Sequence, residues 1–355
     1  MNVLFALRRA RDYHGARVAV YDGERTFTYA QFYDRAVRAG NALRQLGIKR
    51  GDRVAVLMLN SLEYLELYYA TALIGAVIVP INTRWNRNDI AFTLSDSESS
   101  VLALDDRFIG LRNELDAQCC YLYTGRGNCS ESMANYALLV ETASAEELPG
   151  NEPDEEDLVG LFYTSGTTGG PKGVMLTHRN VWTHALYLNL EIPLGPNSVW
   201  FHAAPMFHLA DQWSVYCVTL MGGSHVFLPT FDAEGFLRLV ERHRVTDTVL
   251  IPTMINMLVN HAALHRCDRS SLRTILYGGS PMPLDLLRRA TKSFPCVFRQ
   301  VYGMTEASPL ITAQPSDHDT SDDKLASSAG RPVGASRFAS STSTTSRFLP
   351  AHPAK

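Results

Sequence analysis

The chain has 355 residues, of which 46% are hydrophobic and 19% are charged, a composition typical of a folded protein with two or three domains. Its formal net charge of −3 excludes the strongly basic balance that favours nucleic acid or acidic membrane surfaces. The six cysteines have no CxxC spacing, so they suggest neither a zinc site nor a disulfide framework, and we expect reduced thiols in a cytoplasmic protein.

The most apolar segments are too short or too interrupted to cross a membrane. Residues 3–7 are followed at once by arginines, and the stretch from Tyr68 to Ile81 is broken by Gly75 and Pro80. We therefore predict no integral membrane segment, and we expect this longer stretch to be a buried helix running into a strand.

Helices and strands alternate in the first third of the chain. Thr28 and Gln31 have the spacing of a capping box, and apolar residues then recur at steps of three and four as far as Leu46, before Gly47. The runs that follow predict a strand at 53–58, a helix at 62–74 and a strand at 76–79. Residues 108–157 are acidic and lack a period, which predicts an irregular surface region.

The alternation is clearest from residue 224 onward. Strands are predicted at 224–228, 247–250, 273–277 and 297–303, and helices at 232–244, 253–264 and 283–293. Strands interleaved with helices indicate a parallel sheet that is covered on both faces. The predicted fold class is therefore α/β.

Residues 161–180, LFYTSGTTGGPKGVMLTHRN, form the most informative segment. Hydroxyl-bearing residues and glycines lie between two strand-like apolar runs, together with a single cation, Lys172. Glycines let backbone N–H groups approach an anion, and hydroxyls with a lysine complete a phosphate cradle. The simpler alternative is a glycine-rich hairpin turn with a surface lysine.

Two other nucleotide-binding patterns do not fit this segment. A Walker loop requires Gly, four residues, Gly-Lys and then Ser or Thr. Counted from Gly166, the second glycine is replaced by Pro171 and the hydroxyl residue by Gly173. No GxGxxG opens a helix either, so a P-loop kinase and a dinucleotide-binding fold are both excluded.

Three further segments accompany this motif: HAAPMFHLA at 202–210, YGGSPMP at 277–283 and VYGMTEASP at 301–309. Together the four segments resemble the AMP-forming acyl-CoA synthetase superfamily, which includes luciferases and peptide-synthetase adenylation domains. The resemblance extends from about residue 17 to about residue 334. It implies an N-terminal AMP-binding body, 1–334, with two parallel-sheet α/β subdomains and an incomplete β-barrel. The implied ranges are roughly 1–175 and 176–310 for the subdomains and 311–334 for the start of the barrel.

The resemblance implies a two-step reaction. A carboxylate attacks the α-phosphorus of ATP to give an acyl-adenylate and pyrophosphate, and coenzyme A then displaces AMP to form a thioester. Because two anions must be brought together, positioning and charge neutralisation carry most of the catalysis. The implied partners are a small carboxylic acid, ATP and coenzyme A, with Mg²⁺ as cofactor and without nucleic acid; a homodimer is left open.

The resemblance also assigns site residues. Thr305 matches the α-phosphate contact, Glu306 the magnesium carboxylate, and His208 the gate between the acid and the nucleotide, while Tyr302 would lie against the adenine ring. Without the motif, Glu306 would be taken for a surface residue and Tyr302 for a core residue. The implied phosphate-binding residues are Thr164, Ser165, Gly166, Thr167, Thr168 and Lys172. The implied base-pocket residues are Gly278, Gly279, Ser280 and Gly303. The implied catalytic set is Thr164, Lys172, His208, Thr305 and Glu306.

The identity of the acid is left open by the sequence. The apolar neighbours of His208 favour an apolar, fatty acyl group, as in bacterial fatty-acid-CoA ligases. If Asp211, Gln212 and Trp213 line the pocket, an aromatic or hydroxycinnamic acid is the alternative. A carrier-protein-loading adenylation domain shares every motif. His202 and His225 fit strands and are assigned structural roles.

The last 21 residues, 335–355, include eight serines and threonines and no Asp or Glu, and we expect this tail to be disordered. The ribose-binding aspartate, the hinge and the lid domain with its lysine, which the family has after this point, are absent from the sequence. Codons can be chosen so that one stretch of DNA encodes both the observed tail and, after a one-base shift near Gly334, a family-like strand sequence. We therefore expect a frameshift tail and impaired ligase turnover. The alternative of another class is a non-catalytic fragment that binds nucleotide or acyl groups.

Overall fold

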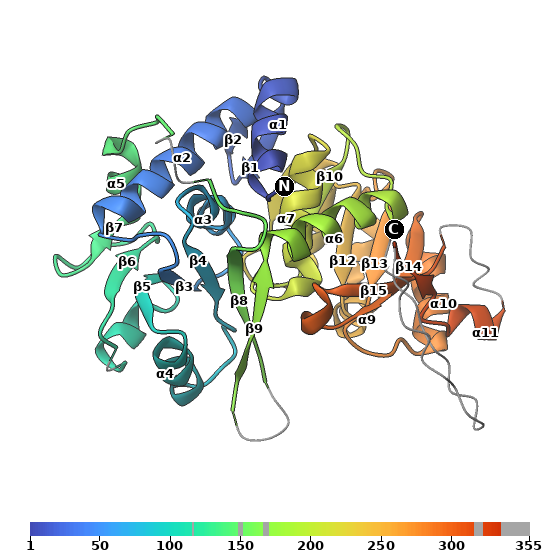
Figure 1. Cartoon of the computed structure of the whole chain (residues 1–355). Coiled ribbons are helices and arrows are strands. Elements are labelled where there is room, and N and C mark those ends of the chain that lie inside the picture. Colours follow the sequence, from blue (N-terminus) through green and yellow to red (C-terminus); the bar gives the residue numbers. More distant parts are fainter. Residues whose placement is uncertain (116, 148–151, 166–169, 316–321, 335–355) are drawn as a thin grey trace, which may run out of the picture.

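The computed structural model describes residues 1–115, 117–147, 152–165, 170–315 and 322–334. Within these ranges the chain is an α/β protein whose two sheets lie side by side with helices around them (Figure 1). The predicted phosphate-binding residues Gly166, Thr167 and Thr168 and the tail 335–355 lie outside the described residues.

The first sheet has seven strands. They are β3 (Arg53–Leu57), β4 (Val77–Pro80), β5 (Ser99–Leu104), β6 (Cys120–Tyr123), β7 (Ala134–Asn135), β8 (Leu158–Thr164) and β9 (Lys172–Thr177). Their order is β7-β6-β5-β3-β4-β8-β9, and all neighbours are parallel except β8 and β9. The β8–β9 pair is an antiparallel hairpin that extends beyond the sheets in Figure 1.

The second sheet has nine strands. They are β1 (Val18–Asp22), β2 (Arg25–Thr28), β10 (Val199–His202), β11 (Ser224–Phe227), β12 (Asp247–Leu250), β13 (Thr274–Tyr277), β14 (Val297–Gly303), β15 (Leu310–Ala313) and β16 (Arg331–Pro332). The order is β16-β15-β14-β13-β12-β10-β11-β1-β2. The strands from β14 to β1 are parallel, and the outer pairs at both edges are antiparallel.

The described α-helices are α1 (Leu4–His14), α2 (Tyr29–Gln45), α3 (Leu62–Leu73), α4 (Arg87–Asp96), α5 (Tyr136–Thr142), α6 (His178–Glu191), α7 (Leu209–Leu220), α8 (Ala233–His243), α9 (Pro252–Val259), α10 (Leu284–Ser293) and α11 (Asp323–Ala326). Three short 3₁₀ helices are η1 (Ile109–Asn113), η2 (Ala262–Arg266) and η3 (Thr305–Ala307). Helix α2 begins at the predicted capping box: the Thr28 side chain accepts from the Gln31 N–H, and the Gln31 side chain accepts from the Thr28 N–H.

The two halves of the chain share one apolar core, because α3 and α7 pack against each other. The ring of Tyr216 on α7 lies edge-on to the rings of Tyr68 and Tyr69 on α3, at centroid distances of 6.4 and 5.6 Å. All three rings are fully buried. Such edge-to-face contacts and the apolar area that they bury join the two sheets into one body.

Most of the predicted elements are present, and the α/β class is confirmed. Two predictions are wrong. The segment 108–157 is not irregular throughout, since it contains η1, β6, β7 and α5. The helix predicted at 253–264 ends at Val259 and is followed by η2. Strands β15 and β16 extend the nine-stranded sheet, and no closed barrel is formed by the residues that the structure describes.

Candidate active site

The candidate site lies where the parallel strands of the nine-stranded sheet end. Strands β10, β12, β13 and β14 are neighbours and run in the same direction, so their carboxyl ends meet at one edge. In open α/β sheets, ligands bind in the crevice outside this edge. Gly278 and Gly279 follow β13, and Thr305 lies two residues after β14, while buried side chains fix the backbone of β12 and β13.

A cavity of about 330 Å³ opens at this edge. Among the residues that the structure describes, its only charged lining side chain is Arg84, which comes from the turn after β4 of the other sheet. Most of the lining is apolar or glycine. The lining residues are Arg84, Ala204, Pro205, His208, Leu209, Ala210, Trp213, Val249, Leu250, Ile251, Gly278, Gly279, Val301, Gly303, Met304, Thr305, Pro309 and Leu310.

At two positions of the lining, the local structure requires glycine. Gly279 has a φ of +77°, a left-handed conformation that residues with a Cβ rarely adopt. Gly303 lies so close to the chain at Pro309 that a Cβ there would meet the Pro309 carbonyl oxygen at 2.0 Å. At these two positions the wall of the cavity is bare backbone, which a flat ring or a phosphate can approach closely.

The turn after β14 positions Thr305. The Met304 N–H donates to the Pro309 carbonyl at 2.8 Å, and the Ala307 N–H donates to the Met304 carbonyl at 2.9 Å. These bonds close a compact turn around η3. Thr305 lines the cavity, whereas Glu306 beside it is exposed.

His208 lines the same cavity from the residue that immediately precedes α7. Its side chain is exposed at the cavity, and its ring lies 4.3 Å from that of Phe207. Desolvation by the neighbouring protein, together with the positive charge of Arg84, lowers the pKa of His208. The imidazole is therefore neutral near pH 7, so it can donate one hydrogen bond and accept another without adding charge.

The structure brings five of the predicted site residues to this one cavity: His208, Gly278, Gly279, Gly303 and Thr305. Ser280, Tyr302 and Glu306 are neighbours in sequence, and all three are exposed. Thr164, Ser165 and Lys172 belong to the β8–β9 hairpin, at or next to its strand ends, and are not among the described lining residues of the cavity. The ligand-binding and catalytic roles of these residues remain predictions.

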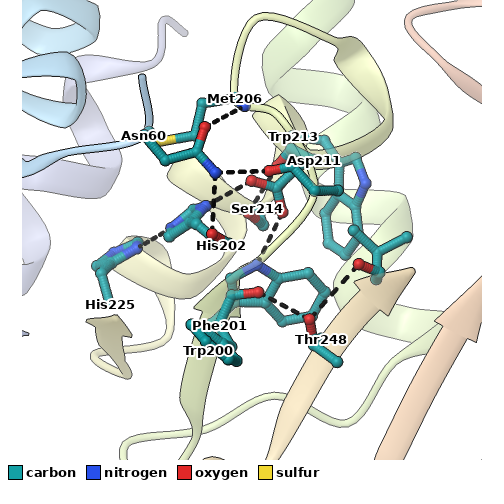
Figure 2. A network of polar contacts seen from close by, with 12 residues as sticks. Asn60, Trp200, Phe201, His202, Met206, Asp211, Trp213, Ser214, His225 and Thr248 are labelled. Carbon is teal, nitrogen blue, oxygen red and sulfur yellow. Dashed lines mark hydrogen bonds and ion pairs between the residues drawn. The ribbon is translucent and has the colours of Figure 1, made fainter. Parts of the chain in front are cut away.

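The three side chains considered for selection of the acid do not all line the cavity. Trp213 lines the cavity, whereas Asp211 and Gln212 are buried and are not among its described lining residues. Figure 2 shows Asp211 bound to His202, with 2.6 Å between Asp211 Oδ2 and His202 Nδ1, while the Trp200 indole donates to Asp211 Oδ1 at 3.1 Å. His202 in turn contacts His225, at 2.9 Å between Nε2 and Nδ1. Asp211 thus belongs to the core beneath the site.

Two residues near the site were missed by the sequence analysis. Arg84 follows strand β4 by four positions, and this location at a carboxyl strand end was the available signal. Asn60 follows β3 by three positions and lies buried in contact with the segment 202–206. Nothing in the local sequence around Asn60 indicates that partner.

Comparison with known proteins agrees with this geometry. The family model described as AMP-binding enzyme matches residues 7–340. The chain belongs to the AMP-binding enzyme family.

A feruloyl-CoA synthase of Amycolatopsis sp is 37% identical over 311 residues, which cover 86% of this chain and 59% of that protein. The chain therefore spans about three fifths of the length of this curated relative of the AMP-binding family.

Solved structures of the AMP-binding family share the fold. The crystal structure of the N-terminal domain of FACL13 from Mycobacterium tuberculosis has a TM-score of 0.83 at 29% identity, over 94% of this chain and 83% of that one. The o-succinylbenzoate CoA synthetase MenE from Bacillus subtilis, in complex with the acyl-adenylate OSB-AMP, has a TM-score of 0.78 at 28% identity, over 92% of this chain and 80% of that one. No helix within the described ranges is both long and apolar enough to span a bilayer.

Proposed function

We propose that the chain binds ATP and a carboxylic acid in the cavity between His208 and Thr305 and joins them as an acyl-adenylate. A carboxylate oxygen would form a bond to the α-phosphorus while the bond from that phosphorus to the bridging oxygen of pyrophosphate breaks. The observation that carries this proposal is the cavity at the carboxyl edge of β10, β12, β13 and β14, with bare backbone at its glycines and the side chains of Arg84, His208 and Thr305 in its lining. The acyl-adenylate held by the related MenE supports it.

Charge neutralisation in the cavity would come first from Arg84, the charged side chain of the described lining. Acid and phosphate are both anions, so a cation within the lining lowers the cost of bringing them together. A neutral His208 can donate to the acid without fixing it as a tight ion pair. Thr305 would donate its hydroxyl to the α-phosphate.

The exposed carboxylate of Glu306, adjacent to Thr305, suits Mg²⁺, which binds through one or two protein carboxylates together with substrate phosphates. When bound, the ion would neutralise charge on the departing pyrophosphate. Tyr302 is half exposed beside the glycine wall, so its ring is available for the adenine. The hydroxyls of Thr164 and Ser165 and the ammonium of Lys172 would serve the outer phosphates.

The acid that we propose has a compact apolar or aromatic body. Trp213 and aliphatic side chains form most of the wall beyond His208, and the cavity of about 330 Å³ has to receive both the acyl group and the adenylate end. The name of the related feruloyl-CoA synthase is consistent with an aromatic acid. We propose coenzyme A as the thiol that accepts the acyl group in the second step.

Calorimetry with ATP and Mg²⁺, then with short-chain, long-chain and hydroxycinnamic acids, tests the binding half of this proposal. ATP-dependent pyrophosphate exchange with the acid that binds best tests the chemical half. We expect ATP binding that Thr305→Val weakens about 10- to 100-fold, because a hydrogen bond to a charged group is lost. Thr142→Val, on the exposed face of α5, is the matched control and should bind as the wild type does.

Three outcomes are distinguishable. Binding with exchange supports adenylate formation. Binding without exchange indicates the non-catalytic nucleotide-binding alternative. If ATP fails to bind, or if Thr305→Val and Thr142→Val bind equally, the proposed site is wrong. Thioester formation with coenzyme A, compared with thioester formation with a carrier protein, shows which of the two thiols accepts the acyl group in the second step.

A further inference from the structure

The segment 203–208, which we call the strap, forms a wall between two cavities. Ala204, Pro205 and His208 face the candidate site, while Ala203, Pro205 and Phe207 face a second cavity of about 220 Å³. The second cavity is lined by apolar side chains that include Met58, Phe108 and Met254, together with the polar side chains of Asn60, Thr83, Arg84, Arg107 and Thr230. The position of the strap therefore decides whether the space behind it is open to a substrate.

One buried side chain holds the middle of the strap. Asn60, which is 4% exposed, accepts the Met206 N–H on its Oδ1 at 2.8 Å (Figure 2). Its Nδ2 lies 2.9 Å from the His202 carbonyl oxygen, 2.8 Å from that of Ala204 and 3.2 Å from that of Leu228. Because three carbonyls need a donor and one N–H needs an acceptor, the partners fix the orientation of the amide. Both hydrogens and the oxygen of Asn60 are engaged.

Two further contacts complete the anchoring. The Tyr68 hydroxyl donates to the Met206 carbonyl at 2.7 Å, so both backbone polar groups of Met206 are held by the α3 region. The ends of the strap are joined by the His202–Asp211 contact, since one residue precedes the strap and the other lies in the first turn of α7. A backbone segment with its polar groups satisfied by buried side chains cannot move without leaving several of them unpaired.

We propose that Asn60 is a positioning residue that sets the size of the acyl site by holding the strap between the two cavities. This inference rests on the proposed function. With Asn60 in place, the acid is limited to the space in front of Pro205. Without it, the strap can yield toward the second cavity, and the two spaces merge into a longer site in which an acyl chain can contact Met58, Phe108 and Met254.

The test uses acyl-sulfamoyl adenosines, stable mimics of acyl-adenylates, with butanoyl, octanoyl and dodecanoyl groups. Calorimetry should show that the wild-type chain prefers butanoyl. Asn60→Ala should raise the affinity for dodecanoyl relative to butanoyl by about tenfold or more, the gain expected from burying about two methylenes. Tyr68→Phe, which removes only the hydroxyl that holds Met206, should shift the preference in the same direction by less.

A second substitution provides a rescue. Thr230 is exposed at the rim of the second cavity, so Thr230→Trp can fill that space without disturbing the core. The double variant Asn60→Ala/Thr230→Trp should regain the wild-type preference, and Thr230→Trp alone should leave it unchanged. General destabilisation by Asn60→Ala would weaken all three mimics equally and would not be rescued in this way.

Amide hydrogen exchange of the unliganded proteins gives an independent measurement. Exchange at 203–208 should be faster in Asn60→Ala than in the wild type, while exchange along α8 stays the same. The inference is overturned if Asn60→Ala leaves exchange in the strap unchanged. It is also overturned if Asn60→Ala and Tyr68→Phe are both folded and both keep the wild-type preference among the three mimics. If the wild type binds none of the mimics, the proposed function fails, and an unaltered strap exchange would separately refute the anchoring by Asn60.

Discussion

A single glycine, Gly303, shapes part of the wall of the candidate site. Gly303 pairs with Leu310 across the β14–β15 ladder and touches the Pro309 carbonyl, so the wall of the cavity has no room for one additional carbon. A Cβ added at Gly303 would lie 2.0 Å from the Pro309 carbonyl oxygen, and rotating a side chain cannot relieve a clash with a backbone atom. The chain itself would have to move.

Gly303→Ala should therefore lower the free energy of unfolding by about 1–3 kcal/mol, the usual cost of overpacking, and weaken ATP binding at the same time. Urea unfolding and calorimetry measure the two effects. Gly110→Ala is the matched control, because a Cβ at that exposed glycine meets nothing within 4 Å. Equal stability of the two variants would contradict this account of the wall.

Among individual residues, the sequence predicts those that belong to a recognisable motif. It misses those whose contacts are with residues far away in the sequence. His208, Gly278, Gly279, Gly303 and Thr305 were identified because each belongs to a segment that resembles a motif of the family. The contact of Asn60 with Met206 joins positions 146 residues apart, and no local pattern encodes it. Likewise, the sequence left open whether Asp211 lines the pocket, because the direction of its side chain depends on its contacts with His202 and Trp200.

Three helices of the first half of the chain meet at a buried ion pair. Glu66 on α3 is fully buried; Arg35 on α2 contacts both of its carboxylate oxygens, and the Tyr136 hydroxyl on α5 donates to Oε2 at 2.7 Å. Burial raises the pKa of Glu66, against the attraction of Arg35. The arginine is thus what keeps the charged form tolerable inside the core.

Arg35→Met should lower the free energy of unfolding by about 3–5 kcal/mol, because it leaves a buried carboxylate without its cation. The pKa of Glu66 is then raised further, so the deficit should grow as the pH rises and shrink at acid pH, where the carboxyl is protonated. Denaturant unfolding at several pH values measures this. Arg179→Met, which breaks an exposed pair with Glu155, should cost less than about 1 kcal/mol. A deficit for Arg35→Met that grows as the pH falls would refute the explanation.

Helices and strands with a clear periodicity of apolar residues were predicted from the sequence. Short elements without such a periodicity were not. The capping box and the apolar spacing of α2 are local signals, and so is the strand–helix alternation from β11 to β14. By contrast, β7 has two residues and α5 has seven, so neither shows enough of a period to stand out between 108 and 157. The pairing of β1 with β11 depends on tertiary contacts between segments about 200 residues apart.

At the scale of the whole molecule, the core contains buried histidines whose side chains are neutral in the folded state. Burial lowers the pKa values of His178 and His184 to about 4. His184 on α6 accepts the Leu310 N–H on Nε2 at 2.8 Å, which fastens β15 beside the candidate site. Protonation of His184 would remove the lone pair that accepts this bond.

The stability of the protein should therefore fall as the pH falls from about 6.5, the usual pKa of an unfolded histidine, to about 4. In this window the unfolded chain binds a proton at position 184 that the folded chain does not bind. The full effect of His184 is about 3 kcal/mol. His184→Gln, whose side-chain oxygen can still accept from Leu310, should flatten the pH dependence of urea unfolding, whereas His265→Gln, at an exposed position, should not. If His184→Gln loses stability as steeply as the wild type between these pH values, the acid sensitivity arises from other groups.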